Sequence, residues 1–200
     1  MSTSLHKVLA EASVNLHCIK GLEKGSEMLF VCLYVDDIIY MGASAQQTEI
    51  FKLHMIDQFE ITDLRILHYF LGLEIHQSSE GITISQTKYA GDLLHKFGME
   101  GCKHLATHMN ANKKLKLTDG TIEGDAVKYR SMVGELLYLT HTHPNLIYAI
   151  SLVSRFMCQP TMQHPGAVKR ILCYAAGIQT LGIHYTHAHE FNLVGYTDSD

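Results

Sequence analysis

The stretch Leu33-Tyr34-Val35-Asp36-Asp37-Ile38-Ile39-Tyr40 decides how the rest of this sequence is interpreted. Before the two acids, the run Met28–Val35 is apolar and rich in β-branched and aromatic residues, which is typical of a buried strand. After the acids, the run Ile38–Met41 is apolar again. The pattern predicts a β-hairpin with Asp36 and Asp37 at its tip.

The pair of adjacent carboxylates at this tip has two interpretations. Adjacent carboxylates repel each other, so beside apolar strands both need solvent or a bound cation. A divalent metal ion removes that cost, and in phosphoryl transfer two Mg²⁺ ions about 3.5–4 Å apart hold the attacking and leaving oxygens. Considered alone, Asp36 and Asp37 fit either a metal site or a solvated turn without a ligand.

Further hairpins are predicted downstream. The apolar and aromatic stretch His68–His76 is predicted as one strand, Ser78–Gly81 as a turn and Ile82–Ile84 as the returning strand. Near the C-terminus, Leu181–Tyr185 and Phe191–Tyr196 are predicted as the two strands of a new hairpin.

Helical periodicity predicts five helices. Ser44 and Gln47 have the spacing of a capping box at the start of the first helix. The helices are Ala45–Gln58, Gln86–Phe97, Tyr129–Thr140, one that begins at Pro144 and extends to Met157, and one from Val168 to Gly177. Residues 100–125 show no clean period and are predicted to form an exposed connector.

Charge is unevenly distributed along the 200 residues. The net charge of −4 excludes a histone-like nucleic-acid binder, and the 46% hydrophobic content is enough for a buried core. Residues 1–85 carry −6, residues 86–173 carry +5 and residues 174–200 carry −3. The basic middle fits a segment that contacts a polyanion, and it equally fits helices with ordinary solvated faces.

The cysteines and the hydropathy of the chain indicate the cellular compartment in which the protein is expected. The chain has an odd number of cysteines and no Cys-x-x-Cys pair, which favours reduced, buried thiols in an intracellular protein. They are Cys18, Cys32, Cys102, Cys158 and Cys173. No apolar run approaches the ~20 residues that span a bilayer, so secretion and membrane insertion are not expected.

The hairpin at Asp36 resembles the YVDD catalytic hairpin of reverse transcriptases, and its surroundings resemble the copia-type retrotransposon Pol polyprotein. The similar part is the C-terminal portion of the reverse transcriptase domain running into the start of RNase H. The resemblance covers 28–200 in unbroken order. Its further stretches are Phe59–Leu64, Tyr69–Ile75, Ile84–Tyr89, Val133–Thr140, Tyr148–Ala149, Ser154–Met157, Lys169–Leu172 and Gly195–Asp200.

The resemblance implies an α/β fold composed of a partial reverse-transcriptase palm, a helical thumb and connection, and the first strands of an RNase H-like domain. The implied domains are a non-matching N-terminal segment (1–27), the partial palm with the YVDD hairpin and a primer-grip-like hairpin (28–98), the helical thumb and connection (99–177), and the start of RNase H (178–200).

The resemblance also implies residue roles, with Mg²⁺, a template–primer duplex of RNA or DNA and a deoxynucleoside triphosphate as ligands. Asp36 is the implied principal metal ligand, Asp37 is its neighbour, and Tyr34 lies near the primer terminus and incoming nucleotide. The segment Tyr69-Phe70-Leu71-Gly72 resembles the hairpin that grips the primer, and Asp198 resembles the first RNase H acid. The expected contacts to the nucleic-acid backbone are Lys113, Lys114, Lys116, Lys128, Arg130, Lys169 and Arg170.

The sequence departs from the family pattern at the catalytic site. Family members carry a third metal-binding Asp upstream of the YVDD hairpin, whereas residues 1–27 contain no Asp, and the remaining RNase H acids would lie beyond Asp200. Because catalysis of phosphoryl transfer depends on ligand geometry, we expect weak Mg²⁺ binding and no appreciable polymerase or RNase H activity from this chain alone. The alternatives are a non-catalytic nucleic-acid-binding module and a degenerate relic. The intact family works in a cytoplasmic particle or the nucleus.

The fourteen histidines suggest zinc as a further ligand. The groups His104/His108, His141/His143 and His184/His187/His189 have members close enough in sequence to share one ion. No cysteine lies at zinc-finger spacing, so zinc binding is not expected.

Overall fold

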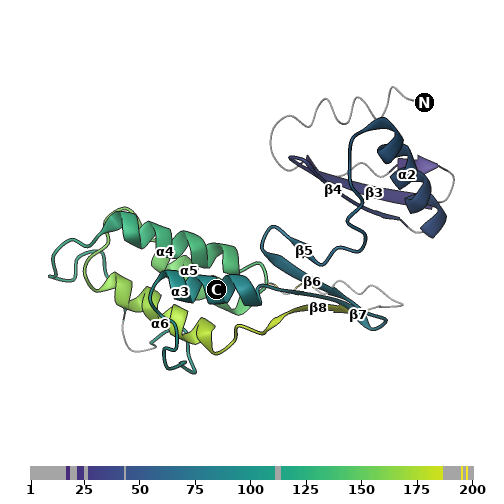
Figure 1. Ribbon diagram of the computed structural model, residues 1–200. Helices are drawn as coiled ribbons and strands as arrows, with labels where there is room; N and C mark the ends of the chain where they lie inside the picture. The colour runs from purple at the N-terminus through teal and green to yellow at the C-terminus, as the bar shows by residue number, and fades with distance from the viewer. Residues whose placement is uncertain are drawn as a thin grey trace. The chain divides into compact units, whose positions relative to one another are not determined.

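The computed structural model describes residues 17–18, 22–24, 27–42, 44–110, 114–186, 195 and 197. The chain divides into two compact units, Met1–Arg65 and Ile66–Asp200 (Figure 1). Helices and strands are mixed in the manner of the predicted α/β class.

In the first unit, β3 (Glu27–Tyr34) is the central strand of an antiparallel sheet. β4 (Asp37–Gly42) pairs along one edge of β3, from Leu29↔Gly42 to Tyr34↔Asp37. The short strands β1 (His17–Cys18) and β2 (Leu22–Lys24) pair with two different parts of β3. The predicted hairpin is confirmed, with Asp36 in its two-residue loop and Asp37 as the first residue of β4.

Helix α2 (Ala45–Gln58) packs on one face of this sheet and has the predicted bounds. Phe51 and Met55 pack with Leu29 in a small core, and the Phe51 ring lies 5.2 Å from that of Tyr40. The predicted capping box is wrong. Ser44 is the N-cap residue but makes no side-chain cap hydrogen bond, and the Gln47 carboxamide oxygen is buried without a hydrogen-bond partner among the described residues.

In the second unit, four antiparallel strands follow the order β5-β6-β7-β8. They are β5 (Tyr69–Phe70), β6 (Leu73–Gln77), β7 (Gly81–Ser85) and β8 (Gly182–Thr186). The prediction of one strand over His68–His76 is wrong, because Leu71 and Gly72 form a two-residue turn with φ values of 49° and 81°. The β6–β7 hairpin is confirmed.

Strand β8 pairs with β7, about a hundred residues earlier in the chain, from Ser85↔Gly182 to Gly81↔Thr186. Gly81 lies so close to β8 that a Cβ there would collide with the Tyr185 carbonyl group. The strand predicted over Phe191–Tyr196 lies outside the described residues, except for Gly195. β8 therefore extends the sheet formed by β5, β6 and β7.

The helices of the second unit surround its apolar core (Figure 1). They are α3 (Thr87–Lys96), α4 (Ala126–Leu139), the 3₁₀ turn η1 (Pro144–Leu146), α5 (Ile147–Ser154) and α6 (His164–Ala176). Each of the four helices predicted in this unit is present, with bounds that differ from the prediction. α4 begins three residues early because the Asp125 carboxylate caps it, accepting from the Val127 and Lys128 amides at 3.0 Å.

The described part of the connector over residues 100–125 has no regular helix or strand, as predicted, but it is anchored to the helices. The Thr161 hydroxyl donates to the Asp119 carboxylate at 2.5 Å, and the buried His164 ring lies 3.0 Å from the Lys116 carbonyl. The hydroxyls of Thr121 and Thr161 lower the pKa of Asp119 to about 2. The prediction of a purely exposed connector is therefore wrong.

Among the described cysteines Cys32, Cys102, Cys158 and Cys173, the last three have free thiols. Cys158 is exposed, contrary to the prediction of burial, and the other three are half-buried. In the part of the chain that the structure describes, no helix is long and apolar enough to cross a membrane.

Candidate active site

The tip of the β3–β4 hairpin is a two-residue loop of Val35 and Asp36, because Tyr34 pairs with Asp37. Val35 has a φ of 54° and is 79% exposed. Positive φ at the first loop position is usual for glycine and costs a β-branched residue about 1–3 kcal/mol. The continuous β3–β4 pairing below the loop holds this conformation.

Both carboxylates at the tip are open to solvent. Asp36 and Asp37 are exposed, whereas Tyr34, opposite Asp37, is half-buried. Since Ile38 and Tyr40 pack toward α2, strand alternation puts Asp37 and Tyr34 on the sheet face that α2 does not cover. The tip thus brings together the three predicted residues of this site.

Carboxylate oxygens are the ligands that Mg²⁺ prefers, so Asp36 and Asp37 suit it chemically. Among the described residues, no group of three or more His, Cys, Asp or Glu side chains is arranged to hold a metal ion. The tip therefore presents two adjacent carboxylates.

The second candidate element is the β5–β6 hairpin, whose tip is the turn Leu71–Gly72. Tyr69 is 53% exposed and Leu71 is 41% exposed, whereas Phe70 and Gly72 are half-buried. The Tyr138 hydroxyl, from α4, donates to the Leu71 carbonyl. Tyr138 lies in the stretch Val133–Thr140, which resembles the copia-type polyproteins, but no role was predicted for it from the sequence.

A polar cluster lies beside Tyr138. The Tyr89 hydroxyl donates to the Glu135 carbonyl at 3.0 Å and lies 2.9 Å from its carboxylate, which also pairs with Lys96. Lys96 lowers the pKa of Glu135, and burial, followed by the bond to Glu135, raises the pKa of Tyr89. Glu135 is therefore ionised and Tyr89 is protonated near neutral pH.

The predicted basic contacts are distributed over the connector, α4 and α6. Their exposed members are Lys114, Lys116, Lys128, Arg130 and Lys169. Arg170 is half-buried and donates to the Thr107 hydroxyl at 2.7 Å, and Arg130 donates to the Met157 carbonyl at 3.2 Å. Lys113 lies outside the described residues, as does Asp198.

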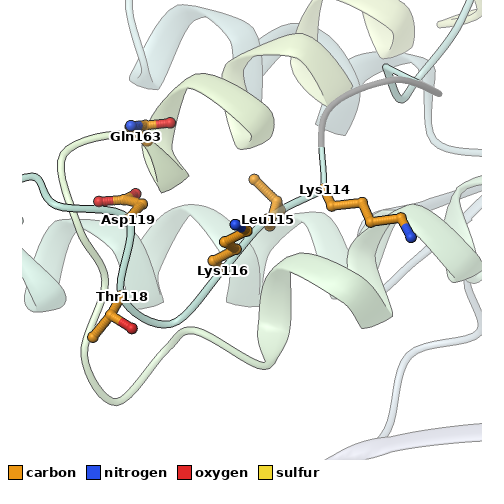
Figure 2. Close-up of a pocket in the computed structure, with 6 residues that line it drawn as sticks. All are labelled: Lys114, Leu115, Lys116, Thr118, Asp119 and Gln163. Atoms are coloured by element: carbon orange, nitrogen blue, oxygen red, sulfur yellow. The ribbon is translucent and has the colours of Figure 1, made fainter.

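Two cavities bring some of these basic residues together. Lys114 and Lys116 line a cavity of about 390 Å³ with Leu115, Thr118, Asp119 and Gln163 (Figure 2). Arg170 lines a second cavity of about 280 Å³, which also contacts Leu115 and Gln163. Asp119 offsets part of the positive charge in the first cavity.

The histidines with clear partners make structural hydrogen bonds. The buried His143 ring lies 2.8 Å from the Thr142 hydroxyl and 3.0 Å from the Ile178 carbonyl. His184 lies 2.8 Å from the Thr83 hydroxyl across the β7–β8 pair. His187 and His189 lie outside the described residues, so the expectation about zinc stays a prediction.

Comparison with known proteins gives a family match. The model of the family described as "Reverse transcriptase (RNA-dependent DNA polymerase)" matches residues 1–111. The match includes residues 1–27, where no motif carried the resemblance. No solved structure matches the chain significantly.

Similar curated proteins are retrotransposon products and a mitochondrial protein. The chain is 37% identical over 183 residues to the "Retrovirus-related Pol polyprotein from transposon RE2" of Arabidopsis thaliana, covering 90% of this chain and 12% of that protein. It is 31% identical over 184 residues to the corresponding TNT 1-94 polyprotein of Nicotiana tabacum, with 88% and 14% coverage. It is 34% identical over 175 residues to "Uncharacterized mitochondrial protein AtMg00810" of Arabidopsis thaliana, with 86% and 71% coverage. The chain thus spans about an eighth of the RE2 polyprotein.

Proposed function

This chain belongs to the reverse transcriptase family, among the copia-type Pol polyproteins, and from that premise we propose that it supplies the metal-binding hairpin and the primer-holding hairpin of a polymerase. The reaction of the intact enzyme is template-directed nucleotidyl transfer to a primer. The observation that carries the proposal is the presentation of Asp36 and Asp37 at a solvent-open hairpin tip with a left-handed loop residue.

Each residue at the tip has a separate role in this proposal. Asp36 is the principal ligand of Mg²⁺ and Asp37 is its neighbouring ligand. When bound, the ion stabilises the charge that develops on the transferred phosphoryl group. Tyr34, on the same sheet face as Asp37, lies beside the primer terminus and the incoming nucleotide.

A polypeptide of these 200 residues alone is proposed to be inactive as a polymerase and as an RNase H. Two carboxylates bind Mg²⁺ weakly, and a two-metal site needs further ligands in fixed geometry. Residues 1–27 offer no aspartate as that third ligand. The finer assignments of palm, thumb and connection, and of residues 178–200 to RNase H, belong to the same proposal.

A hybrid protein tests this function. These 200 residues replace the matching stretch of the RE2 polyprotein, and primer extension on an RNA template is measured for the hybrid and for its Asp36→Asn/Asp37→Asn variant. We expect extension by the hybrid and at least a hundredfold loss in the variant.

The matched control is Asp57→Asn, which removes an exposed carboxylate from α2 and should leave extension unchanged. Equal activity of the hybrid and its double variant would contradict the proposed role of the tip. Extension by the 200-residue polypeptide above that of its own double variant would contradict the proposed inactivity.

A second candidate function is nucleic-acid binding without catalysis. It is favoured by the exposed lysines at positions 114, 116, 128 and 169, none of which forms an ion pair with another described residue. Lysines of this kind release counterions from a duplex, so binding should weaken steeply with salt. Salt-dependent duplex binding that persists in the double variant, together with an inactive hybrid, would favour this candidate.

A further inference from the structure

The β5–β6 hairpin pairs over a short length beside its tip, with one further backbone hydrogen bond from Ile75 to the His68 carbonyl at 2.8 Å. Only two residue pairs, Tyr69↔Glu74 and Phe70↔Leu73, precede the turn. β5 is the edge strand of its sheet, so backbone pairing holds it on one side only, through β6. Moreover, Leu71 at φ 49° occupies the left-handed region, which disfavours residues other than glycine. The tip therefore needs an outside contact to keep one conformation.

Tyr138 supplies that contact from near the C-terminus of α4, 67 residues downstream. Its hydroxyl donates to the Leu71 carbonyl, which is the peptide group at the centre of the turn. Its ring packs beside the turn, because a Cβ at Gly72 would lie 3.5 Å from the ring carbon Cε1. Both loop residues are thus held by one side chain.

Tyr138 is itself fixed on several sides. Its ring packs edge-on against that of Tyr89, with centroids 5.0 Å apart and an angle of 76°. Its backbone carbonyl accepts from the Gln86 carboxamide at 3.3 Å and from the His141 ring at 2.8 Å. A side chain held in this way transmits the position of α4 to the hairpin.

We propose that Tyr138 is the positioning residue of the primer-holding hairpin, fixing Leu71 and Gly72 in the conformation that contacts the primer backbone. The contact with the primer rests on the proposed function, whereas the anchoring of the turn does not. Tyr138 touches no reacting group in this role and acts through the hairpin.

The test uses the full chain, its Tyr138→Phe variant and a matched control. Tyr129→Phe is the control because the Tyr129 hydroxyl also donates to a backbone carbonyl, that of Val153 at 2.7 Å, within the helical core. Both variants lose one hydroxyl and one hydrogen bond of the same kind.

The first readout is NMR with ¹³C-carbonyl leucine and ¹⁵N-glycine. Only the Leu71–Gly72 and Leu181–Gly182 peptide groups join these residue types in this order, so the spectrum has two signals and one is an internal reference. In Tyr138→Phe, the Leu71 carbonyl resonance should move upfield, because it loses its acceptor role, while that of Leu181 stays. In Tyr129→Phe neither should move. An unchanged Leu71 signal in Tyr138→Phe would overturn the proposal.

The second readout is the affinity for a labelled RNA–DNA primer–template duplex. Tyr138→Phe should weaken binding by about two- to tenfold, the equivalent of one ordinary hydrogen bond. Tyr129→Phe should lower the melting temperature and leave the affinity unchanged. A lower melting temperature with unchanged affinity in Tyr138→Phe would show that Tyr138 stabilises the fold and does not position the hairpin for the primer. Absence of duplex binding by the unaltered chain would show that it does not hold a primer by itself, and the Leu71 signal would still decide whether Tyr138 anchors the turn.

Discussion

The two units of this chain differ in how much core supports their functional hairpins. In the first unit, the described core contains three buried residues, Leu29, Phe51 and Met55, under a hairpin that presents two carboxylates. In the second unit, seventeen buried residues, fifteen of them from the helices α3, α4, α5 and α6, form one continuous core. Most of the described apolar burial is therefore far in sequence from the candidate metal ligands.

The residues that contribute most to the stability of the chain are therefore different from those proposed to bind the metal ion. Hydrophobic burial is the main source of folding free energy, so the helical unit should set the stability of the chain. The hairpin of Asp36 and Asp37 depends on a thin core and is expected to open locally at a lower free energy. Substitutions in each unit should therefore differ in how much they destabilise the chain and in which unit they act.

The largest effect is expected from Leu136→Ala in α4. Leu136 is 0% exposed, and truncating a fully buried leucine costs about 2–5 kcal/mol. Chemical denaturation should show this loss in the unfolding free energy of the helical unit. The control is the neighbouring Leu137→Ala, since Leu137 is 43% exposed and should cost far less. Equal losses would mean that the core is assigned wrongly.

Phe51→Ala should have a smaller and local effect. The variant loses the contacts of Phe51 with Leu29, Met55 and Tyr40, and its cost is limited by the free energy of opening the first unit locally, which the small core keeps low. Hydrogen exchange should show loss of protection in β3, β4 and α2, with α4 and α5 unchanged. Loss of protection in both units would show that they unfold together.

Acid stability should depend on Asp119. Its folded-state pKa of about 2 is below its ordinary value of 3.8, so its contribution is complete above about pH 4 and is lost as the pH falls toward 2. Denaturation midpoints of the unaltered chain should fall across this window, and Asp119→Asn should fall less steeply there. If the denaturation midpoints of the two proteins depend on pH in the same way, the Thr121 and Thr161 hydroxyls do not stabilise the ionised carboxylate.

The smallest effect on stability is expected from Asp36→Asn/Asp37→Asn. Both side chains are exposed, and substitutions at such positions usually change stability by no more than about 0.5 kcal/mol. The melting curve of the first unit should stay in place or shift slightly upward, because the repulsion between the carboxylates disappears. A clear downward shift would assign the pair a structural role.

Local sequence patterns predicted the elements whose residues lie close together in the chain. The Asp36 hairpin and α2 follow from apolar runs interrupted by turn residues, and the core faces of α4 and α6 follow from helical periodicity. The helix bounds that were missed depend on capping. Asp125 extends α4 and the 3₁₀ turn at Pro144 delays α5, and neither changes the apolar pattern.

The features that were missed depend on contacts distant in sequence. No local pattern indicates that β8 pairs with β7, that Tyr138 reaches the Leu71 carbonyl, or that Thr161 bonds Asp119. The turn at Leu71–Gly72 was the exception, because Gly72 within an apolar stretch is a signal for a tight turn. At the candidate metal site, the residue pair was predicted from the sequence, and the conformation of Val35 was not.

In the proposed function, the tip of the β3–β4 hairpin binds a divalent metal ion through Asp36 and Asp37. Titration of the ¹⁵N-labelled chain with Mn²⁺, which broadens nearby NMR signals, tests it most directly. Broadening should centre on the signals of Val35, Asp36 and Asp37, be removed by excess Mg²⁺ and be absent in Asp36→Asn/Asp37→Asn. Broadening that persists in the double variant, or that centres on other carboxylates and leaves the tip sharp, would contradict it.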